Sequence, residues 1–114
     1  MNNTAYVGAM ADVFAALAHP TRRMLLDLVG RKESNVGDLV DAVHMSQPAV
    51  SKQLGVLRDA GLVKVRVHGK QRMYRIDPAP LQDVDEWIAR YRPYFEANMD
   101  ALERHLDQKK RRRK

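Results

Sequence analysis

The sequence predicts a mainly α-helical fold with a small β-hairpin, and three features of its pattern carry that prediction. Two short amphipathic stretches, residues 36–43 and 47–60, are separated by only three residues. Alternating apolar and basic residues at positions 62–76 follow at once and predict the hairpin. A long stretch with apolar residues every three or four positions then closes the chain. Two short helices joined by a tight turn and followed by a hairpin predict a winged helix-turn-helix, dimeric through its N- and C-terminal helices.

The first two helices are predicted over residues 6–18 and 20–29. One face of the first carries Met10, Val13, Phe14 and Leu17, and the second is expected to bury most of Leu25, Leu26, Leu28 and Val29. Pro20 suits the first turn of a helix, and Gly30 is expected to end it. Arg22 and Arg23 stand in that first turn, against the preference of the helix dipole. This indicates a phosphate partner for at least one of them, although solvated surface arginines explain the pattern equally well.

The second of the two short helices, residues 47–60, is the centre of the predicted fold. Its core stripe is Val50, Leu54 and Leu57, spaced at i, i+4 and i+7. Ser46 is a good N-cap, Pro48 is tolerated in the first turn, and Gly61 provides the stop. The other faces carry small or polar residues and no acid: Gln47, Ala49, Ser51, Lys52, Gln53 and Val56. Such a face suits the major groove of DNA, but taken alone it fits a solvated surface helix as well.

The predicted hairpin strengthens the first of these interpretations. Its basic residues are Lys64, Arg66, Lys70, Arg72 and Arg75, and no acid occurs between Ala60 and Ile76. Val63, Val65 and Val67 alternate with them at the period of a half-buried strand. A basic hairpin beside a helix-turn-helix is a wing, which lies along the phosphate backbone or enters the neighbouring minor groove.

The last helix is expected over residues 81–106, bent or divided near Arg92 by Pro93. Its apolar stripe is too long for so small a domain to cover, so part of it is expected to pack on a second copy of the chain. The expected dimer contacts are Met10, Phe14, Leu17, Tyr91, Phe95, Met99 and Leu102. A two-fold dimer presents two recognition helices to an inverted repeat in double-stranded DNA. The alternative is that this helix packs in the core of its own chain. The aromatic residues of the helix are expected either to fill a core or to line a cavity.

Composition and charge limit the classes of function that the chain can have. The 114 residues are expected to form one domain over residues 1–108, followed by a basic tail over 109–114. The tail carries six positive charges, which equals the formal net charge of +6, so the body is neutral but polarised. No cysteine is present, which excludes disulfides and thiolate metal ligands. No apolar run is long enough for a bilayer and the N-terminus has no basic signal region, so a cytoplasmic protein without membrane contact is expected. The four histidines are scattered and no phosphate loop occurs, so we expect no enzyme and no cofactor.

These phrases together resemble the ArsR/SmtB family of bacterial winged-helix repressors. The phrases are FAALAHPTR (14–22), VGDL (36–39), SQPAVSKQL (46–54), VLRDAGLV (56–63) and GKQRMY (69–74), and the resemblance covers residues 10–106. It implies a homodimer that binds an operator and blocks transcription until an inducer releases it. The implied DNA contacts are Gln47, Ala49, Ser51, Lys52, Gln53, Lys70 and Arg72, and Arg66 and Arg22 are added as candidate phosphate contacts. Many relatives carry histidine where this chain has Gln53, which is expected to alter the bases read.

The pattern departs from the metal-sensing members of that family. Their best-known site is a cysteine-containing phrase before the turn, where this chain has GDLVDA (37–42). Their second site would need further histidines beside His105, and the predicted last helix contains no other histidine. We therefore expect no metal site. A metal-responsive repressor remains an alternative, as does a winged-helix module for protein partners whose DNA affinity is non-specific. The sequence leaves the operator, the regulated genes, the inducer and the direction of regulation open.

Overall fold

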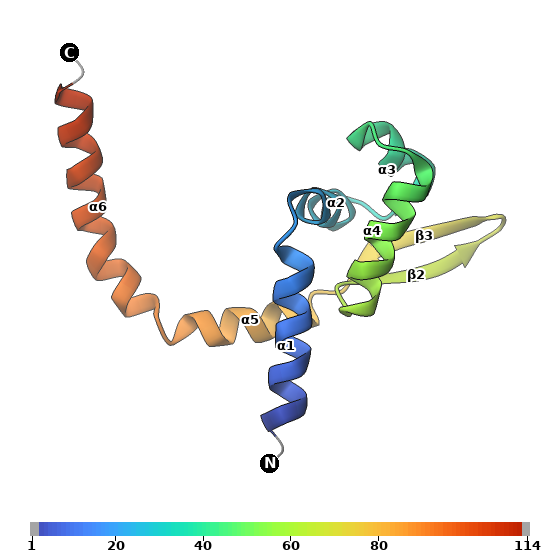
Figure 1. Cartoon of the computed structure of the whole chain (residues 1–114), viewed down its shortest axis with the longest axis horizontal. Helices are drawn as coiled ribbons and strands as arrows, with labels where there is room; N and C mark the ends of the chain where they lie inside the picture. Colours follow the sequence, from blue (N-terminus) through green and yellow to red (C-terminus); the bar gives the residue numbers. More distant parts are fainter. Residues whose placement is uncertain (1–2, 113–114) are drawn as a thin grey trace. The chain divides into compact units, whose positions relative to one another are not determined.

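The computed structural model describes residues 3–112, with side chains for 8–99 and 101–109. It confirms the predicted mainly helical winged helix-turn-helix with a small antiparallel sheet (Figure 1). The elements are α1 (Asn3–Leu17), α2 (Pro20–Arg31), β1 (Ser34–Asn35), α3 (Val36–Val43), α4 (Gln47–Asp59), β2 (Val63–His68), β3 (Gln71–Ile76), α5 (Ala79–Ala89) and α6 (Arg92–Arg112). The chain divides between Asp83 and Val84 into two compact units.

The first unit is built around the buried stripe of α4. Val50, Leu54 and Leu57 are all fully buried, as the i, i+4, i+7 spacing predicts. The same core contains Leu25, Leu26, Val29, Leu39, Leu62, Val63 and Tyr74. Each fully buried leucine stabilises the fold by roughly 1.5–3 kcal/mol relative to an exposed one. The burial on one side of α4 therefore fixes which of its residues remain outside.

The turn between α3 and α4 is closed by two caps. His44 ends α3 in the left-handed conformation at φ 55°, and its N–H donates to the Val40 carbonyl. Ser46 begins α4, where its hydroxyl oxygen accepts from the Ala49 N–H at 3.3 Å. The predicted three-residue turn and the serine cap are both confirmed, and His44 is an exposed capping residue.

The sheet has a strand that periodicity did not predict. Its order is β1-β3-β2, and β1 pairs with β3 through Ser34 opposite Tyr74 and Asn35 opposite Met73. A strand of two residues has no alternation to detect, so only the structure reveals it. The predicted wing is confirmed as the antiparallel pair β2 and β3, which turns at Gly69 with φ 64°.

The C-terminal end of α2 differs from the prediction. Gly30 does not end α2, which continues to Arg31 and is closed by the Lys32 N–H donating to the Leu28 carbonyl at 3.2 Å. A glycine inside a helix costs only about 1 kcal/mol, and the packing of α2 offsets it. Leu28 is half-buried rather than buried, because it lies beside the stripe of Leu25 and Val29.

The predicted last helix is divided, as expected, next to Pro93. The helix α5 ends at Ala89, and α6 begins at Arg92 with Pro93 in its first turn, where the missing N–H costs nothing. The helix α6 runs beyond the predicted end to Arg112, so it includes the first four residues of the basic sequence at 109–114. Arg113 and Lys114 lie outside the described residues, and the domain boundary at 108 stays a prediction.

Two glycines, one inside α4 and one just after it, should respond oppositely to alanine. Gly61 has φ 79°, so we expect Gly61→Ala to lower the free energy of unfolding by about 1–2 kcal/mol. Gly55 lies inside α4, with nothing within 4 Å of an added Cβ, so Gly55→Ala should raise it by roughly 0.5–1 kcal/mol. Urea denaturation of both variants measures the difference. Equal effects of the two changes would contradict this description of the α4 terminus.

Candidate nucleic-acid interface

The outward residues of α4 are the first part of the candidate interface. Gln47, Ser51 and Lys52 are exposed, while Ala49 and Gln53 are half-buried at its edge. These are the positions that the sequence predicts to contact DNA. Before Asp59 the helix has no acidic residue, so its first three turns offer hydrogen-bonding groups and positive charge without repelling phosphate.

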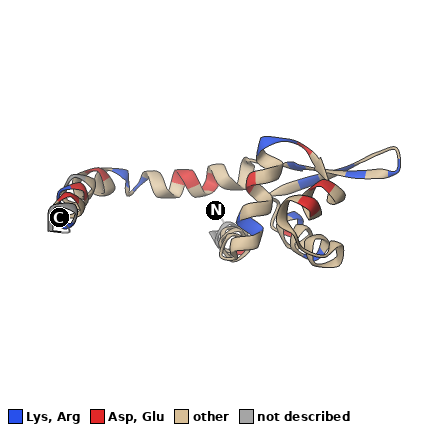
Figure 2. Cartoon of the chain, turned by 90° about the horizontal axis from the view of Figure 1, so that it is seen from above, with Lys and Arg blue, Asp and Glu red and all other residues tan. Residues whose placement is uncertain are grey.

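A surface groove brings α4 and the wing together. It has a volume of about 400 Å³ and is lined by Asn35, Val36, Gly37, Gln47, Lys70, Gln71 and Arg72. Gln47 comes from the first turn of α4, and Lys70 and Arg72 come from the tip of the wing, where Figure 2 shows basic residues. Asn35 caps α3 by accepting from the Asp38 N–H at 2.8 Å, which places a helix N-terminus at the same groove. Cationic side chains beside a helix N-terminus suit the phosphates of a polyanion.

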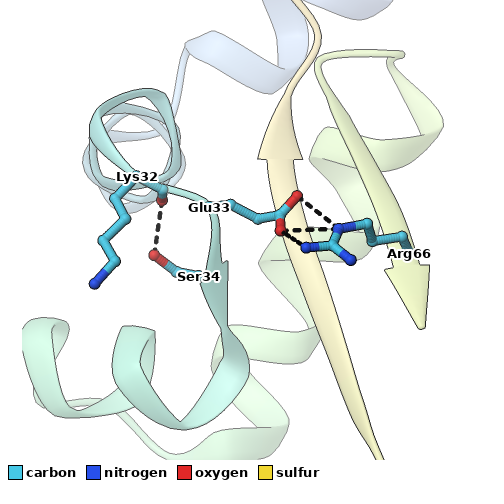
Figure 3. Close-up of polar contacts among 4 residues, drawn as sticks. All are labelled: Lys32, Glu33, Ser34 and Arg66. Atoms are coloured by element: carbon cyan, nitrogen blue, oxygen red, sulfur yellow. Dashed lines mark hydrogen bonds and ion pairs between the residues drawn. The ribbon is translucent and has the colours of Figure 1, made fainter. Parts of the chain in front are cut away.

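The third predicted wing cation, Arg66, has a carboxylate partner. Its Nε donates to both oxygens of Glu33, at 2.9 and 3.0 Å, and its Nη2 donates to Oε1 (Figure 3). These hydrogen bonds lower the pKa of Glu33 and raise the pKa of Arg66. Lys64 is similarly placed 3.5 Å from Asp77. Two wing cations, Lys64 and Arg66, are therefore paired with carboxylates, whereas Lys70 and Arg72 line the groove at the tip of the wing.

The Glu33 and Arg66 pair links stability to pH. Because the folded pKa of Glu33 lies below its ordinary value of 4.5, the pair stabilises the fold above that pH. The stabilisation is lost as the pH falls through the lowered folded value. We expect Glu33→Gln to lower the melting temperature slightly near neutral pH, and we expect the difference from the unchanged chain to vanish in acid. Thermal unfolding of both proteins across this range measures it, and a difference that grows with acidity would contradict the pairing.

Arg22, which the sequence offers as a phosphate contact, lies among backbone carbonyls. Its Nε donates to the Ala16 carbonyl at 2.7 Å and its Nη2 to the Ala15 carbonyl at 3.0 Å. Arg23 likewise donates to the Leu17 carbonyl at 2.7 Å. Both arginines thus satisfy carbonyls at the C-terminus of α1, where the helix dipole is negative. This explains two basic residues in the first turn of α2, an arrangement that neither sequence-based alternative included.

The candidate dimer residues lie in both units, on α1 in the first and on α6 and the turn before it in the second. On α1, Met10 and Leu17 are half-buried and Phe14 is 39% exposed. In the second unit the apolar stripe is Tyr91, Phe95, Met99, Leu102 and Leu106, with each side chain between 47% and 52% exposed. Every described side chain of α6 is exposed, so the second unit does not bury this stripe by itself. Trp87 and Tyr91 meet edge to face at 5.4 Å between ring centroids.

The described residues do not form a cluster of metal ligands. Across that part of the chain, no three His, Cys, Asp or Glu side chains converge as metal ligands would. None of the helices, so far as the structure describes them, combines the length and apolarity needed to span a bilayer.

The chain is similar to known bacterial regulatory proteins. A family model described as bacterial regulatory protein, arsR family, matches residues 19–65. The chain is 40% identical over 70 residues to the biofilm growth-associated repressor of Xylella fastidiosa, covering 61% of each. It is 30% identical over 82 residues to the transcriptional repressor SdpR of Bacillus subtilis, covering 72% of this chain and 91% of that one.

Solved structures show the same likeness. A homodimeric winged helix-turn-helix DNA-binding domain from Mycobacterium bovis superposes with a TM-score of 0.67 at 31% identity, covering 79% of this chain and 86% of that one. The chain spans about three fifths of the biofilm repressors that it matches, since the matched part is 61% of the Xylella protein.

Proposed function

Because this chain belongs to the ArsR family of bacterial regulatory proteins, we propose that it is a homodimeric transcriptional repressor that binds an inverted-repeat operator in the cytoplasm. The observation that carries the proposal is the groove where Gln47 of α4 meets Lys70 and Arg72 of the wing. A groove of this kind joins groups that read bases to groups that hold phosphates. The comparisons with known proteins confirm the family resemblance seen in the sequence.

Within the major groove, the exposed residues of α4 have separate roles in this proposal. Gln47 and Ser51 read base edges, since amides and hydroxyls bond to the donors and acceptors displayed there. Ala49 is small enough to permit close approach or contact with a thymine methyl. Lys52, Lys70 and Arg72 hold phosphates and set the position of the helix. Arg66 joins them only if a phosphate replaces the Glu33 carboxylate.

The dimer completes the proposed reading of DNA. The exposed stripe of α6 supplies an apolar surface for a second copy, and Met10, Phe14 and Leu17 of α1 add to it. Tyr91, Phe95, Met99 and Leu102 are the contacts that we assign to the second unit. The solved relative from Mycobacterium bovis is homodimeric, which supports the association of two copies. Two copies related by a two-fold axis place two α4 helices on the half-sites of an inverted repeat.

Two single substitutions test the division of roles. We expect Gln47→Ala to weaken binding to the cognate site by about 1–3 kcal/mol and binding to random DNA much less. Lys70→Ala should instead weaken both similarly and reduce the salt slope by ~0.9. Titration of each variant with cognate and with random DNA at several salt concentrations gives the affinity for each DNA and the salt slope. Equal losses for Gln47→Ala on the two DNAs would refute its base-reading role.

A further inference from the structure

Glu33 joins the two edge strands of the sheet across the strand between them. It directly precedes β1, whereas Arg66 belongs to β2, and β3 lies between those two strands. Figure 3 shows the Glu33 carboxylate reaching across β3 to the Arg66 guanidinium group, which donates to it from Nε and Nη2. The side chain of Glu33 is 26% exposed and that of Arg66 is 52% exposed. We call this contact the cross-sheet ion pair.

The strand that follows Glu33 is short and leads directly into the helix-turn-helix. It has only two residues, and the second of them, Asn35, is the N-cap of α3. Asn35 pairs with Met73 of β3, and Met73 pairs with Arg66 of β2, so these three residues form one row across the sheet. Two residue pairs provide few hydrogen bonds between strands. The cross-sheet ion pair therefore adds a second attachment between the start of α3 and the wing.

The tip of the wing has no packing of its own to hold it in place. Val63 and Tyr74 are buried at the base of the wing, but every residue from 66 to 72 is exposed. The cross-sheet ion pair lies where this exposed segment begins. It is thus well placed to fix the direction of the tip.

The same attachment determines the geometry of the candidate groove. Asn35 lines one side of the groove, where α3 begins, and Lys70 and Arg72 of the wing line another. Gln47 lines it from the first turn of α4, which follows α3 after the tight turn. The spacing between the predicted base-reading residue and the wing cations therefore depends on how the wing is attached to the start of α3.

We propose that Glu33 is a positioning residue that holds the wing against the start of α3, so that Lys70 and Arg72 reach phosphates while Gln47 reads bases. The inference rests on the proposed function and adds the residue that sets the geometry of its groove. An exposed ion pair contributes little to stability, but two guanidinium nitrogens on one carboxylate fix the orientation of both groups. In this role Arg66 remains with Glu33 when DNA binds.

Reversing the ion pair separates positioning by Glu33 from a direct phosphate contact by Arg66. Glu33→Arg places two like charges together and breaks the pair, although it adds positive charge to the protein. Combining it with Arg66→Glu restores an ion pair and leaves the net charge of the protein unchanged. Asp27→Arg is the matched control for charge, since Asp27 is exposed on α2 and belongs to none of the ion pairs found among the described residues.

The experiment is a titration of the full-length protein and each variant with the operator selected from random DNA, at several salt concentrations. Circular dichroism first shows whether each variant folds. Glu33→Arg should weaken operator binding by roughly 10-fold, about the value of one charge-assisted hydrogen bond, and reduce the salt slope by ~0.9. The reversed pair should restore both values, and Asp27→Arg should not weaken binding. Adding Lys70→Ala to Glu33→Arg should cost little further affinity, because the tip is already displaced.

Unchanged or tighter operator binding by Glu33→Arg would overturn the inference, since a freed Arg66 would then take up a phosphate in place of the carboxylate. Failure of the reversed pair to restore the affinity would overturn it too, as would an equal loss in Asp27→Arg. If Glu33→Arg does not fold, Glu33→Ala replaces it with the same expected direction. Each of these results leaves the proposed function intact. Failure of the unchanged protein to prefer any DNA sequence would instead refute the proposed function, and the inference with it.

Discussion

Replacing Met99 and Leu102 with glutamate should separate the proposed dimer into monomers and weaken operator binding by ~100-fold or more. Both side chains belong to the stripe of α6 and are about half exposed, at 52% and 48%. A dimer interface would remove them from water, and four buried carboxylates without partners would be strongly unfavourable. A monomer holds only one half-site at a time, so the gain from linked binding is lost. Sedimentation measures the assembly, and titration with the selected operator measures the affinity.

The control for this prediction is on the opposite face of the same helix. Ala97 and Ala101 are exposed, and replacing both with glutamate adds the same charge to α6. This double variant should remain dimeric and bind the operator with nearly unchanged affinity. If both double variants stayed dimeric, the stripe would not be the interface. If both became monomeric, the cause would be the added charge and not the apolar surface.

Replacing Leu54 with alanine should lower the free energy of unfolding by about 2–5 kcal/mol. Leu54 is fully buried, and it lies between Val50 and Leu57 on the stripe that attaches α4 to the core. The change removes buried apolar surface and leaves a cavity that its neighbours fill only in part. Such a loss is a large fraction of the stability of a small domain. Urea denaturation followed by circular dichroism measures it.

Ser51→Ala is the control for Leu54→Ala, since it shortens an exposed side chain of the same helix. Surface changes of this type usually alter stability by less than ~0.5 kcal/mol. We expect Ser51→Ala to keep its stability while losing affinity for the operator. Equal stabilities of the two variants would show that Leu54 does not anchor α4, and the orientation of the interface would then need revision.

Much of the fold follows from local pattern. Several elements depend only on about a dozen neighbouring residues each. They are the stripe of α4, the serine cap, the turn at His44 and the two strands of the wing. Periodicity and capping chemistry act over that range, so the sequence predicts these elements correctly. The division near Pro93 is predictable for the same reason, because a proline disrupts only its own helix.

The features that the sequence did not predict depend on residues far apart in the chain. Strand β1 exists because Ser34 and Asn35 pair with β3, about forty residues later. Glu33 partners Arg66 only once β1 has placed it there. The hydrogen bond from Arg22 to Gln53 similarly spans 31 positions. Two arginines in the first turn of α2 do indicate an unusual environment, but the sequence does not show that the C-terminal carbonyls of α1 are their partners.

Selection of bound fragments from random DNA at physiological salt shows whether this protein binds a specific sequence. It should be made with the full chain and with a chain lacking residues 109–114, so that the basic tail cannot account for the result. We expect both to enrich an inverted repeat whose half-sites lie about one helical turn apart. Weak, steeply salt-dependent binding without any enriched sequence would contradict the account, since it would leave only electrostatic attraction to DNA.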